Sequence, residues 1–188
     1  MRPRTKMTRE EYLALEPQEG VKLEWVNGEA YAMSGGRPVH SAIAVNAVLS
    51  LGRRLTGTPC RPTNSDQRLY VEMTQAYFFP DVMVVCPPWQ TVDGDVQSIT
   101  NPRIIVEVLS PSTRDWDLGG KLEHYRRIPS LTDYVIVDPD ARRVTHYSRA
   151  ETGWRLHDIE EGAVPLADLG IELPLDELFA DLDSVPQG

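Results

Sequence analysis

Residues 103–138 read RIIVEVLSPSTRDWDLGGKLEHYRRIPSLTDYVIVD, and this stretch decides the fold. Residues 103–109 are a nearly continuous run of aliphatic, mostly β-branched side chains, which is typical of a strand buried on both faces. Three apolar residues then recur at i, i+4 and i+7 and predict an amphipathic helix that ends before Pro129. These residues are Leu118, Leu122 and Tyr125. A second buried strand is predicted at Asp133–Val137.

The segments before this stretch predict a hairpin, a helix and two strands. Asn27 and Gly28 lie between two β-type runs, and such a pair favours a type I′ turn, which needs positive φ at both central residues. Residues 40–55 carry apolar side chains at helical spacing. Strands are predicted at Gln67–Met73 and Tyr77–Val85, and a loop rich in Pro, Asp and Gly at 87–102.

The segments after it add strands at Val144–Ser148 and Trp154–Ile159 and a short helix around Asp176–Phe179. Together these elements predict an α/β fold with a mixed β-sheet core flanked by helices, an N-terminal hairpin and extra C-terminal strands. The length of 188 residues favours a single domain over residues 1–188.

The net charge of −9 is concentrated at the C-terminal end. Residues 1–150 hold 18 basic and 18 acidic side chains, whereas residues 151–188 hold ten acids and only Arg155. This predicts an acidic C-terminal tail from about residue 160. An acidic protein is a poor non-specific nucleic-acid binder, but the neutral remainder leaves room for a local basic surface. Its candidates, which are equally compatible with solubilising roles on helix faces, are Arg53, Arg54, Arg61, Arg68, Arg114, Arg126 and Arg127.

Cysteine content and the N-terminal sequence favour a cytoplasmic protein. Cys60 and Cys86 are too few for a disulfide framework and indicate a reducing compartment. The basic N-terminal segment is not followed by the apolar stretch of a signal peptide. No run approaches the roughly 18 apolar residues that span a bilayer, so we expect no membrane association.

Two carboxylates stand in predicted strands that are otherwise apolar. Asp81 follows Pro80 at the start of one strand, and Glu107 interrupts the run at 103–109. A buried carboxylate without a partner costs several kcal/mol, so a cation, hydrogen bonds or a metal ion must compensate it. If the two strands pair antiparallel, the start of the first lies opposite the end of the second, which brings Asp81 and Glu107 together.

The following helix supplies a cation. With Leu118 at 0° and about 100° per residue, Lys121 lies near −60°, at the border of the sheet-facing stripe, whereas Glu123 and Arg127 face solvent. Two acids and a lysine that converge are the groups that metal-assisted phosphodiester hydrolysis requires. The alternative is a buried ion-pair cluster that has no catalytic role.

The segments PDVMVV (80–85) and IIVEVLSPSTRDWDLGGKLEHYRRIPSLTDYVIVDP (104–139) resemble the Uma-two family within the PD-(D/E)xK nuclease superfamily. The similarity runs from about Val21 to Asp138. It implies a restriction-endonuclease-like fold and Mg²⁺-dependent DNA cleavage, with Mn²⁺ as a substitute. It identifies Asp81 and Glu107 as metal ligands and Lys121 as the catalytic lysine. In one departure from the superfamily, the E-x-K lysine position holds Leu109, and the helix lysine replaces it.

Four further residues are weaker candidates. Glu24 resembles the acid on the first β-element of the family and would complete the metal shell, the alternative being an exposed strand carboxylate. His40 would contact phosphate or water near the site, or make only a local hydrogen bond at the start of its helix. Ser110 and Ser112 follow the Glu107 strand and are either near the site or simple turn and cap residues.

The sequence therefore predicts a Mg²⁺-dependent endonuclease that acts on DNA and uses Asp81, Glu107, Lys121 and Glu24. One alternative is a non-catalytic nucleic-acid-binding or scaffold protein that keeps the nuclease fold, and another is hydrolysis of a small phosphate ester. We also expect a homodimer, because nucleases that cut two strands commonly use two copies.

Overall fold

The two buried strands predicted at residues 103–109 and 133–137 lie side by side at the centre of a sheet. In this computed structural model, β10 and β11 pair in parallel, with Glu107 beside Ile136. Over the described residues this sheet has six strands in the order β13-β12-β11-β10-β7-β4. The described residues are 4–15, 22–33, 36–111 and 113–186. The strands are β4 (Arg61–Asn64), β7 (Val82–Val85), β10 (Pro102–Val108), β11 (Asp133–Asp138), β12 (Arg143–Arg149) and β13 (Trp154–Ile159).

A second sheet contains the predicted hairpin, whose turn places Asn27 and Gly28 at positive φ. As far as the chain is described, this sheet has seven strands in the order β1-β3-β2-β6-β5-β9-β8, and β14 and β15 form a separate pair. The strands are β1 (Arg4–Lys6), β2 (Leu23–Val26), β3 (Glu29–Ala32), β5 (Arg68–Val71), β6 (Ala76–Phe78), β8 (Thr91–Val92), β9 (Asp95–Ile99), β14 (Ala163–Leu166) and β15 (Ile171–Pro174).

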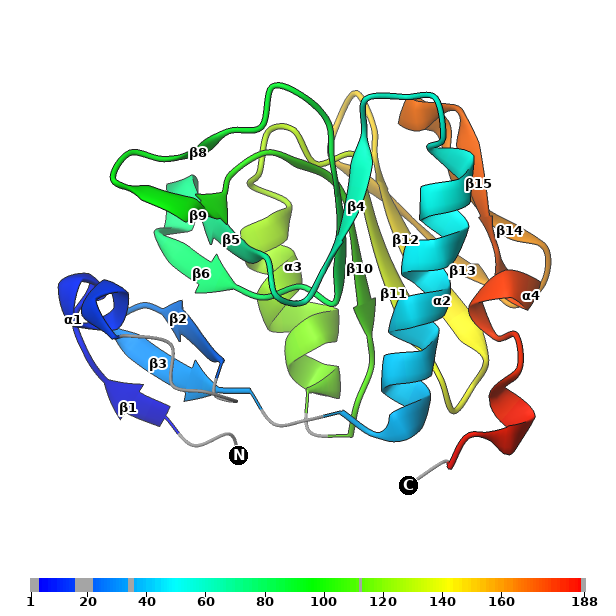
Figure 1. Cartoon of the computed structure of the whole chain (residues 1–188), viewed down its shortest axis with the longest axis horizontal. Coiled ribbons are helices and arrows are strands. Elements are labelled where there is room, and N and C mark those ends of the chain that lie inside the picture. Colours follow the sequence, from blue (N-terminus) through cyan, green and yellow to red (C-terminus); the bar gives the residue numbers. More distant parts are fainter. Residues whose placement is uncertain (1–3, 16–21, 34–35, 112, 187–188) are drawn as a thin grey trace.

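Helices cover both faces of the six-stranded sheet, with α2 on one face and α3 on the other (Figure 1). Alternate residues of the strands serve the two faces: Val82 and Val84 pack with α2, whereas Met83 and Val85 pack on the α3 side. The helices are α1 (Arg9–Ala14), α2 (Pro38–Arg54), α3 (Lys121–Tyr125) and α4 (Leu175–Leu178). The short turns are η1 (Glu72–Thr74), the π-helical η2 (Trp116–Gly120), η3 (Ala167–Leu169) and η4 (Leu182–Ser184).

The prediction of one continuous strand over Tyr77–Val85 is wrong. The segment forms β6 in one sheet and β7 in the other, separated by Phe79, Pro80 and Asp81. Proline has no N–H to donate to a ladder, and the chain changes sheets at this point. The prediction that residues 87–102 form only a loop is also wrong, because β8 and β9 pair there as a hairpin.

The acidic C-terminal segment is part of the core. Its acids are mostly exposed, but alternate apolar residues pack against α2 and the six-stranded sheet. The buried ones are Val164, Leu166, Leu173, Leu175, Leu178, Phe179 and Leu182. Asn46 of α2 donates to the carbonyl oxygens of Leu178 and Ala180, which holds α4 against the helix. The segment therefore covers the face of the sheet that bears α2, and α4 confirms the helix predicted near its end.

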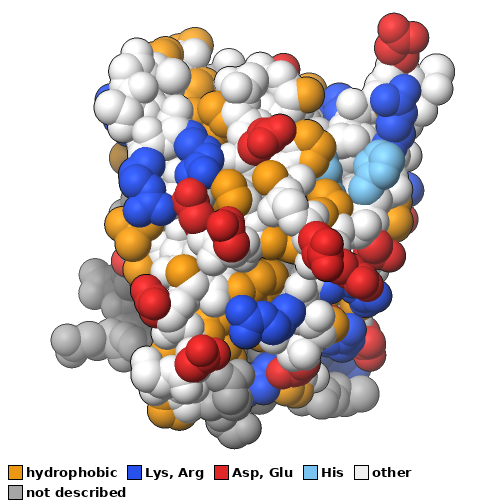
Figure 2. Space-filling model, turned by 90° about the vertical axis from the view of Figure 1, so that its right-hand side faces the viewer, with side chains coloured by type: hydrophobic (Ala, Val, Ile, Leu, Met, Phe, Trp, Pro, Cys, Tyr) orange, Lys and Arg blue, Asp and Glu red, His pale blue; other side chains and the backbone are white. Residues whose placement is uncertain are grey.

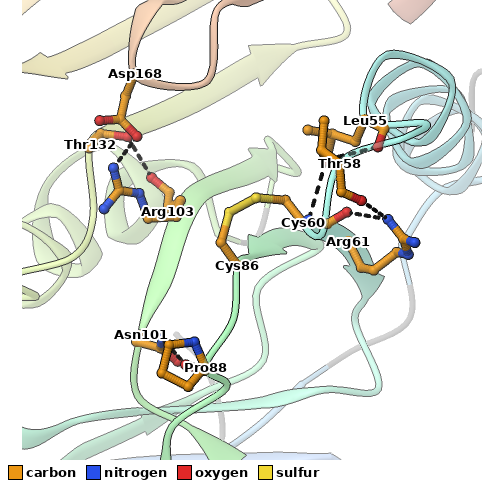
Figure 3. The surroundings of a disulfide bond; sticks show 10 residues. All are labelled: Leu55, Thr58, Cys60, Arg61, Cys86, Pro88, Asn101, Arg103, Thr132 and Asp168. Carbon is orange, nitrogen blue, oxygen red and sulfur yellow. Dashed lines mark hydrogen bonds and ion pairs between the residues drawn. A yellow bond between two sulfur atoms is a disulfide. The ribbon is translucent and has the colours of Figure 1, made fainter.

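Cys60 and Cys86 form a disulfide that the sequence analysis does not predict. Figure 3 shows that it joins the start of β4 to the end of β7. Because Arg61 pairs with Val85 in the antiparallel ladder, the residues just outside this pair face each other. The bond ties the edge strand β4 to the strand that follows Asp81.

Candidate active site

Asp81 and Glu107 meet at the end of the antiparallel ladder of β7 and β10, as the sequence predicts. Val82, the first residue of β7, pairs with Val106 of β10 at the end of the ladder, so the next residues outward are Asp81 and Glu107. The Asp81 N–H donates to Glu107 Oε2 at 3.4 Å. In return, the Val108 N–H donates to Asp81 Oδ2 at 2.8 Å. The ladder itself therefore holds the two carboxylates together.

Lys121 enters from the first turn of α3 and is 2% exposed. Its Nζ lies 2.7 Å from Glu107 Oε1 and 3.2 Å from Glu24 Oε1. Glu24, on β2, is 1% exposed, so the alternative of an exposed strand carboxylate is wrong. Three segments far apart in sequence thus bring their charges into one buried cluster.

Two members of the cluster are missed by the sequence analysis. Asp117 lies in η2, is 2% exposed, and its Oδ1 is 3.3 Å from Lys121 Nζ. Tyr125 is fully buried and donates its hydroxyl to Glu107 Oε1 at 2.8 Å. The helical arithmetic that points to Lys121 also places Asp117 within about 40° of it, but the surrounding residues resemble a capping turn. Tyr125 is predicted only as part of the apolar stripe.

His40 lies beside Asp81. It projects from the first turn of α2, and its Nε2 is 3.2 Å from Asp81 Oδ2. Gly36 allows this approach, because a Cβ at that position would lie 2.7 Å from His40 Nδ1. Ser110 contacts Thr113 through its hydroxyl at 2.9 Å in the turn after β10. Ser112 lies outside the described residues.

Burial and mutual repulsion set the proton affinities in the cluster. Burial, reinforced by Asp81 and Asp117, raises the pKa of Glu107 well above its usual range despite the nearby Lys121. Burial opposes the charge of Lys121, but the Glu107 and Glu24 carboxylates outweigh it and raise its pKa well above the usual value. In the pair formed by Asp81 and His40, burial opposes both charges, but each partner outweighs its effect on the other. His40 lowers the pKa of Asp81, and Asp81 raises the pKa of His40.

The donor set has the chemistry of a site for a hard divalent cation. Four carboxylates (Glu24, Asp81, Glu107 and Asp117) share only Lys121 and His40 as positive partners among the described residues. In the same part of the chain, no three His, Cys, Asp or Glu side chains form a ready-made metal cluster. Mg²⁺ commonly takes one or two protein carboxylates and fills the remaining positions with water and substrate phosphate. Asp81 and Glu107 fit that mode.

Most arginines considered for a basic surface are engaged with acids. The pairs are Arg53 and Arg54 with Glu177, Arg68 with Asp95, Arg114 with Asp138, and Arg126 with Glu123. The side of the molecule that bears β14, β15 and α4 shows basic and acidic side chains interspersed with hydrophobic ones (Figure 2). Over the residues described there, this side carries no continuous basic surface for a nucleic acid.

The chain that forms this cluster matches a known protein family. The family Uma2, described as "Putative restriction endonuclease", matches residues 9–176. The chain belongs to the Uma2 family. The matched range includes every residue of the cluster, from Glu24 to Tyr125.

Two relatives of this Uma2 chain occur in Synechocystis sp.. The uncharacterized protein slr1290 of Synechocystis sp. is 35% identical over 182 residues, which is 96% of this chain and 95% of the relative. A second uncharacterized protein of the same organism, sll1609, is 32% identical over 154 residues, 81% of this chain and 87% of the relative. Both are similar over most of their length.

A solved structure shares the Uma2 fold. The crystal structure of a "putative nuclease belonging to DUF820" from Anabaena variabilis matches with a TM-score of 0.73 and 20% identity, covering 90% of this chain and 96% of that one. The predicted α/β fold is thereby confirmed. Within the described parts of the chain, no helix is long and apolar enough to cross a membrane.

Proposed function

We propose that this Uma2 chain is a Mg²⁺-dependent endonuclease that hydrolyses phosphodiester bonds in DNA, with Mn²⁺ as a substitute cation. The observation that carries the proposal is the convergence of Asp81, which immediately precedes β7, with Glu107 of β10 and Lys121 of α3. The restriction-endonuclease description of the family supports DNA as the substrate, and the description of the structural neighbour as a nuclease supports the reaction class.

Asp81 and Glu107 would hold the cation. The chemistry supplied by a bound divalent cation would be polarisation of a phosphoryl oxygen and a lower pKa for the attacking water. The chain's own groups prepare the ligands: the Val108 N–H fixes Asp81 Oδ2, and the Tyr125 hydroxyl fixes Glu107 Oε1. Lys121 supplies a permanent positive charge beside Glu107, where negative charge would otherwise repel the phosphate.

The exposed fractions indicate the side from which DNA would approach. The side chains of His40 and Asp81 are 17% and 10% exposed, whereas that of Lys121 is 2% exposed. A phosphate would therefore meet Asp81 and His40 first. His40 would then contact a phosphate oxygen or a water molecule beside Asp81.

A plasmid-cleavage assay tests the proposal. With Mg²⁺ or Mn²⁺, the purified protein is expected to convert supercoiled DNA to nicked or linear forms, and EDTA should stop the reaction. Asp81→Asn and Lys121→Ala should each abolish cleavage. Asp115→Asn is the matched control, because Asp115 is an exposed acid outside the cluster. Cleavage that survives both substitutions in the cluster would contradict the proposal.

A binding measurement gives a second readout that does not depend on activity. Because only the folded state holds the ligands together, Mg²⁺ at a hundredfold excess over its Kd should stabilise the protein by about 2.7 kcal/mol, or raise Tm by roughly 5–10 °C. Asp81→Asn should remove this shift, and Asp115→Asn should retain it.

The full burial of Lys121, Glu107 and Glu24 favours one alternative, a non-catalytic nucleic-acid-binding protein that keeps the cluster as a structural element. That alternative predicts DNA binding that is independent of divalent cations and no cleavage. Gel-shift titrations with and without EDTA separate the two proposals.

We also propose that the active form is a homodimer, because a double-strand cut needs two active sites that face opposite strands. Light scattering should give a mass of about twice 21.1 kDa. A monomer mass at the concentration used for cleavage would refute this assembly.

A further inference from the structure

We infer that Asp117 is a positioning residue that holds the Lys121 ammonium in the active site when Glu107 is occupied by a cation. This inference rests on the proposed function, because it assigns Asp117 a part in the same reaction. Asp117 itself is buried and would not touch the substrate.

The side-chain carboxylate of Asp117 forms an ion pair with Lys121. Its carboxylate Oδ1 is 3.3 Å from Lys121 Nζ. Among the described residues, no donor makes a hydrogen bond of good geometry to this oxygen, so the ammonium provides its compensation by charge. A carboxylate that is 2% exposed is costly unless the cation in contact with it, here Lys121, stays in place.

The backbone around Asp117 is held independently of this contact. The Tyr134 hydroxyl donates to the Asp117 carbonyl oxygen at 2.8 Å, and the Asp117 N–H donates to the Thr113 carbonyl oxygen at 2.9 Å. Gly120 has no room for a side chain, because a Cβ there would lie 1.9 Å from the Trp116 ring. The π-helical turn that presents Asp117 one turn before Lys121 is thus fixed by packing.

Lys121 needs a second carboxylate partner because Glu107 has two proposed roles. Its Oε1 makes the shortest contact of Lys121, at 2.7 Å, yet Glu107 is also a proposed cation ligand. A cation on Glu107 would weaken its attraction for the ammonium and repel Lys121. Asp117 Oδ1 and Glu24 Oε1, which lie 3.3 and 3.2 Å from Lys121 Nζ, would then hold the ammonium in place.

Kinetics of Asp117→Asn test the inference. The substitution keeps the size of the side chain and removes its charge. We expect kcat for plasmid cleavage to fall about 10–100-fold, the usual cost of losing a residue that orients an active-site group. KM for DNA should stay within about twofold, because Asp117 lies behind Lys121. Asp115→Asn should match the wild type in both constants. A kcat for Asp117→Asn within twofold of the wild type would overturn the inference.

An NMR measurement separates this inference from the proposed function. A buried, ion-paired ammonium exchanges its protons slowly, so Lys121 Nζ should give a ¹H–¹⁵N signal that disappears in Lys121→Met. With Mg²⁺ present, Asp117→Asn should shift this signal and speed its proton exchange, and Asp115→Asn should not. An unchanged signal in Asp117→Asn would overturn the inference. Wild-type protein without metal-dependent cleavage would refute the proposed function alone.

A double variant keeps the inference falsifiable if Asp117→Asn folds poorly. If Asp117 acts through Lys121, its uncompensated carboxylate destabilises Lys121→Met, and adding Asp117→Asn should raise the Tm of that variant by several degrees. A double variant no more stable than Lys121→Met would show that the two side chains are not coupled, which would overturn the inference.

Discussion

The six-stranded sheet buries two groups of ionisable residues on opposite faces, and the two groups differ in their ratio of acids to bases. On the α3 side, Glu107 belongs to a cluster in which four carboxylates share Lys121 and His40. On the α2 side, Asp133 of β11 faces His146 of β12, with His146 Nε2 2.8 Å from Asp133 Oδ1. The second group has one acid for one base.

The residues around each group explain the difference. The other oxygen of Asp133 accepts a hydrogen bond from the Thr132 hydroxyl at 2.8 Å, and both members of the pair are buried. Such a pair needs no further cation. Among the described residues, the cluster on the α3 side has more acids than bases, and burial, reinforced by Asp81 and Asp117, raises the pKa of Glu107. We interpret the balanced pair as structural and the unbalanced cluster as a site that requires an added cation.

Removal of the ammonium from the unbalanced cluster should have the largest effect. Lys121→Met leaves Glu24, Glu107 and Asp117 buried without it, and we expect a loss of about 3–5 kcal/mol in the free energy of unfolding. Urea unfolding at pH 7 measures it. Glu123→Gln, on the exposed side of the same helix, should change stability by less than about 0.5 kcal/mol. A loss below about 1 kcal/mol for Lys121→Met would mean that the cluster is less charged than we infer.

Breaking the balanced pair should cost less and leave catalysis intact. Asp133→Ala removes the acceptor of His146 and Thr132, and a lost buried acceptor typically costs about 1–3 kcal/mol. Because the pair lies on the face opposite Glu107, cleavage of DNA by the folded variant should match the wild type. Urea unfolding and the plasmid assay measure both effects. If Asp133→Ala abolished cleavage at a temperature where it is folded, the separation of the two groups would be wrong.

Local patterns in the sequence are sufficient to predict two central residues of the cluster on the α3 side. The apolar run at β10 makes Glu107 conspicuous, and helical spacing places Lys121 toward the sheet, in agreement with the structure. Asp117 is within reach of the same arithmetic, but it lies among Ser, Thr and Asp residues that are typical of caps. Nothing in the local sequence distinguishes a capping acid from a buried one.

The pairing of strands that lie far apart in the chain cannot be predicted from a single sequence. The chain leaves one sheet at Phe78 and enters another at Val82, and only Pro80 hints at the break. Cys60 meets Cys86 because β4 pairs with β7, a contact between weakly patterned segments. The strands β14 and β15 contain Pro165 and Pro174, which obscure their alternation, although their apolar residues complete the core.

An ion pair with a partly exposed base extends the comparison, and its loss should have the smallest effect on stability. Arg114, whose side chain is 42% exposed, pairs with Asp138 at the end of β11 at 2.8 Å. Burial opposes ionisation of Asp138, but Arg114 and the N–H groups of Asp140 and Ala141 outweigh it and lower its pKa. Because solvent screens this pair, Arg114→Ala should cost only about 0.5–1 kcal/mol at pH 7.

The pH dependence of that cost follows from the lowered pKa of Asp138. The contribution of the ion pair is complete above the pKa of the unfolded carboxyl and is lost as the pH falls through the lower, folded-state value. The difference between wild type and Arg114→Ala in urea unfolding should therefore be constant from about pH 6 to 8 and shrink toward zero in strong acid. Added salt at pH 7 should reduce it as well. A difference that is unaffected by acid and salt would instead assign the effect to packing of the Arg114 stem, and the three groups would then not form one series of charge pairs ordered by burial.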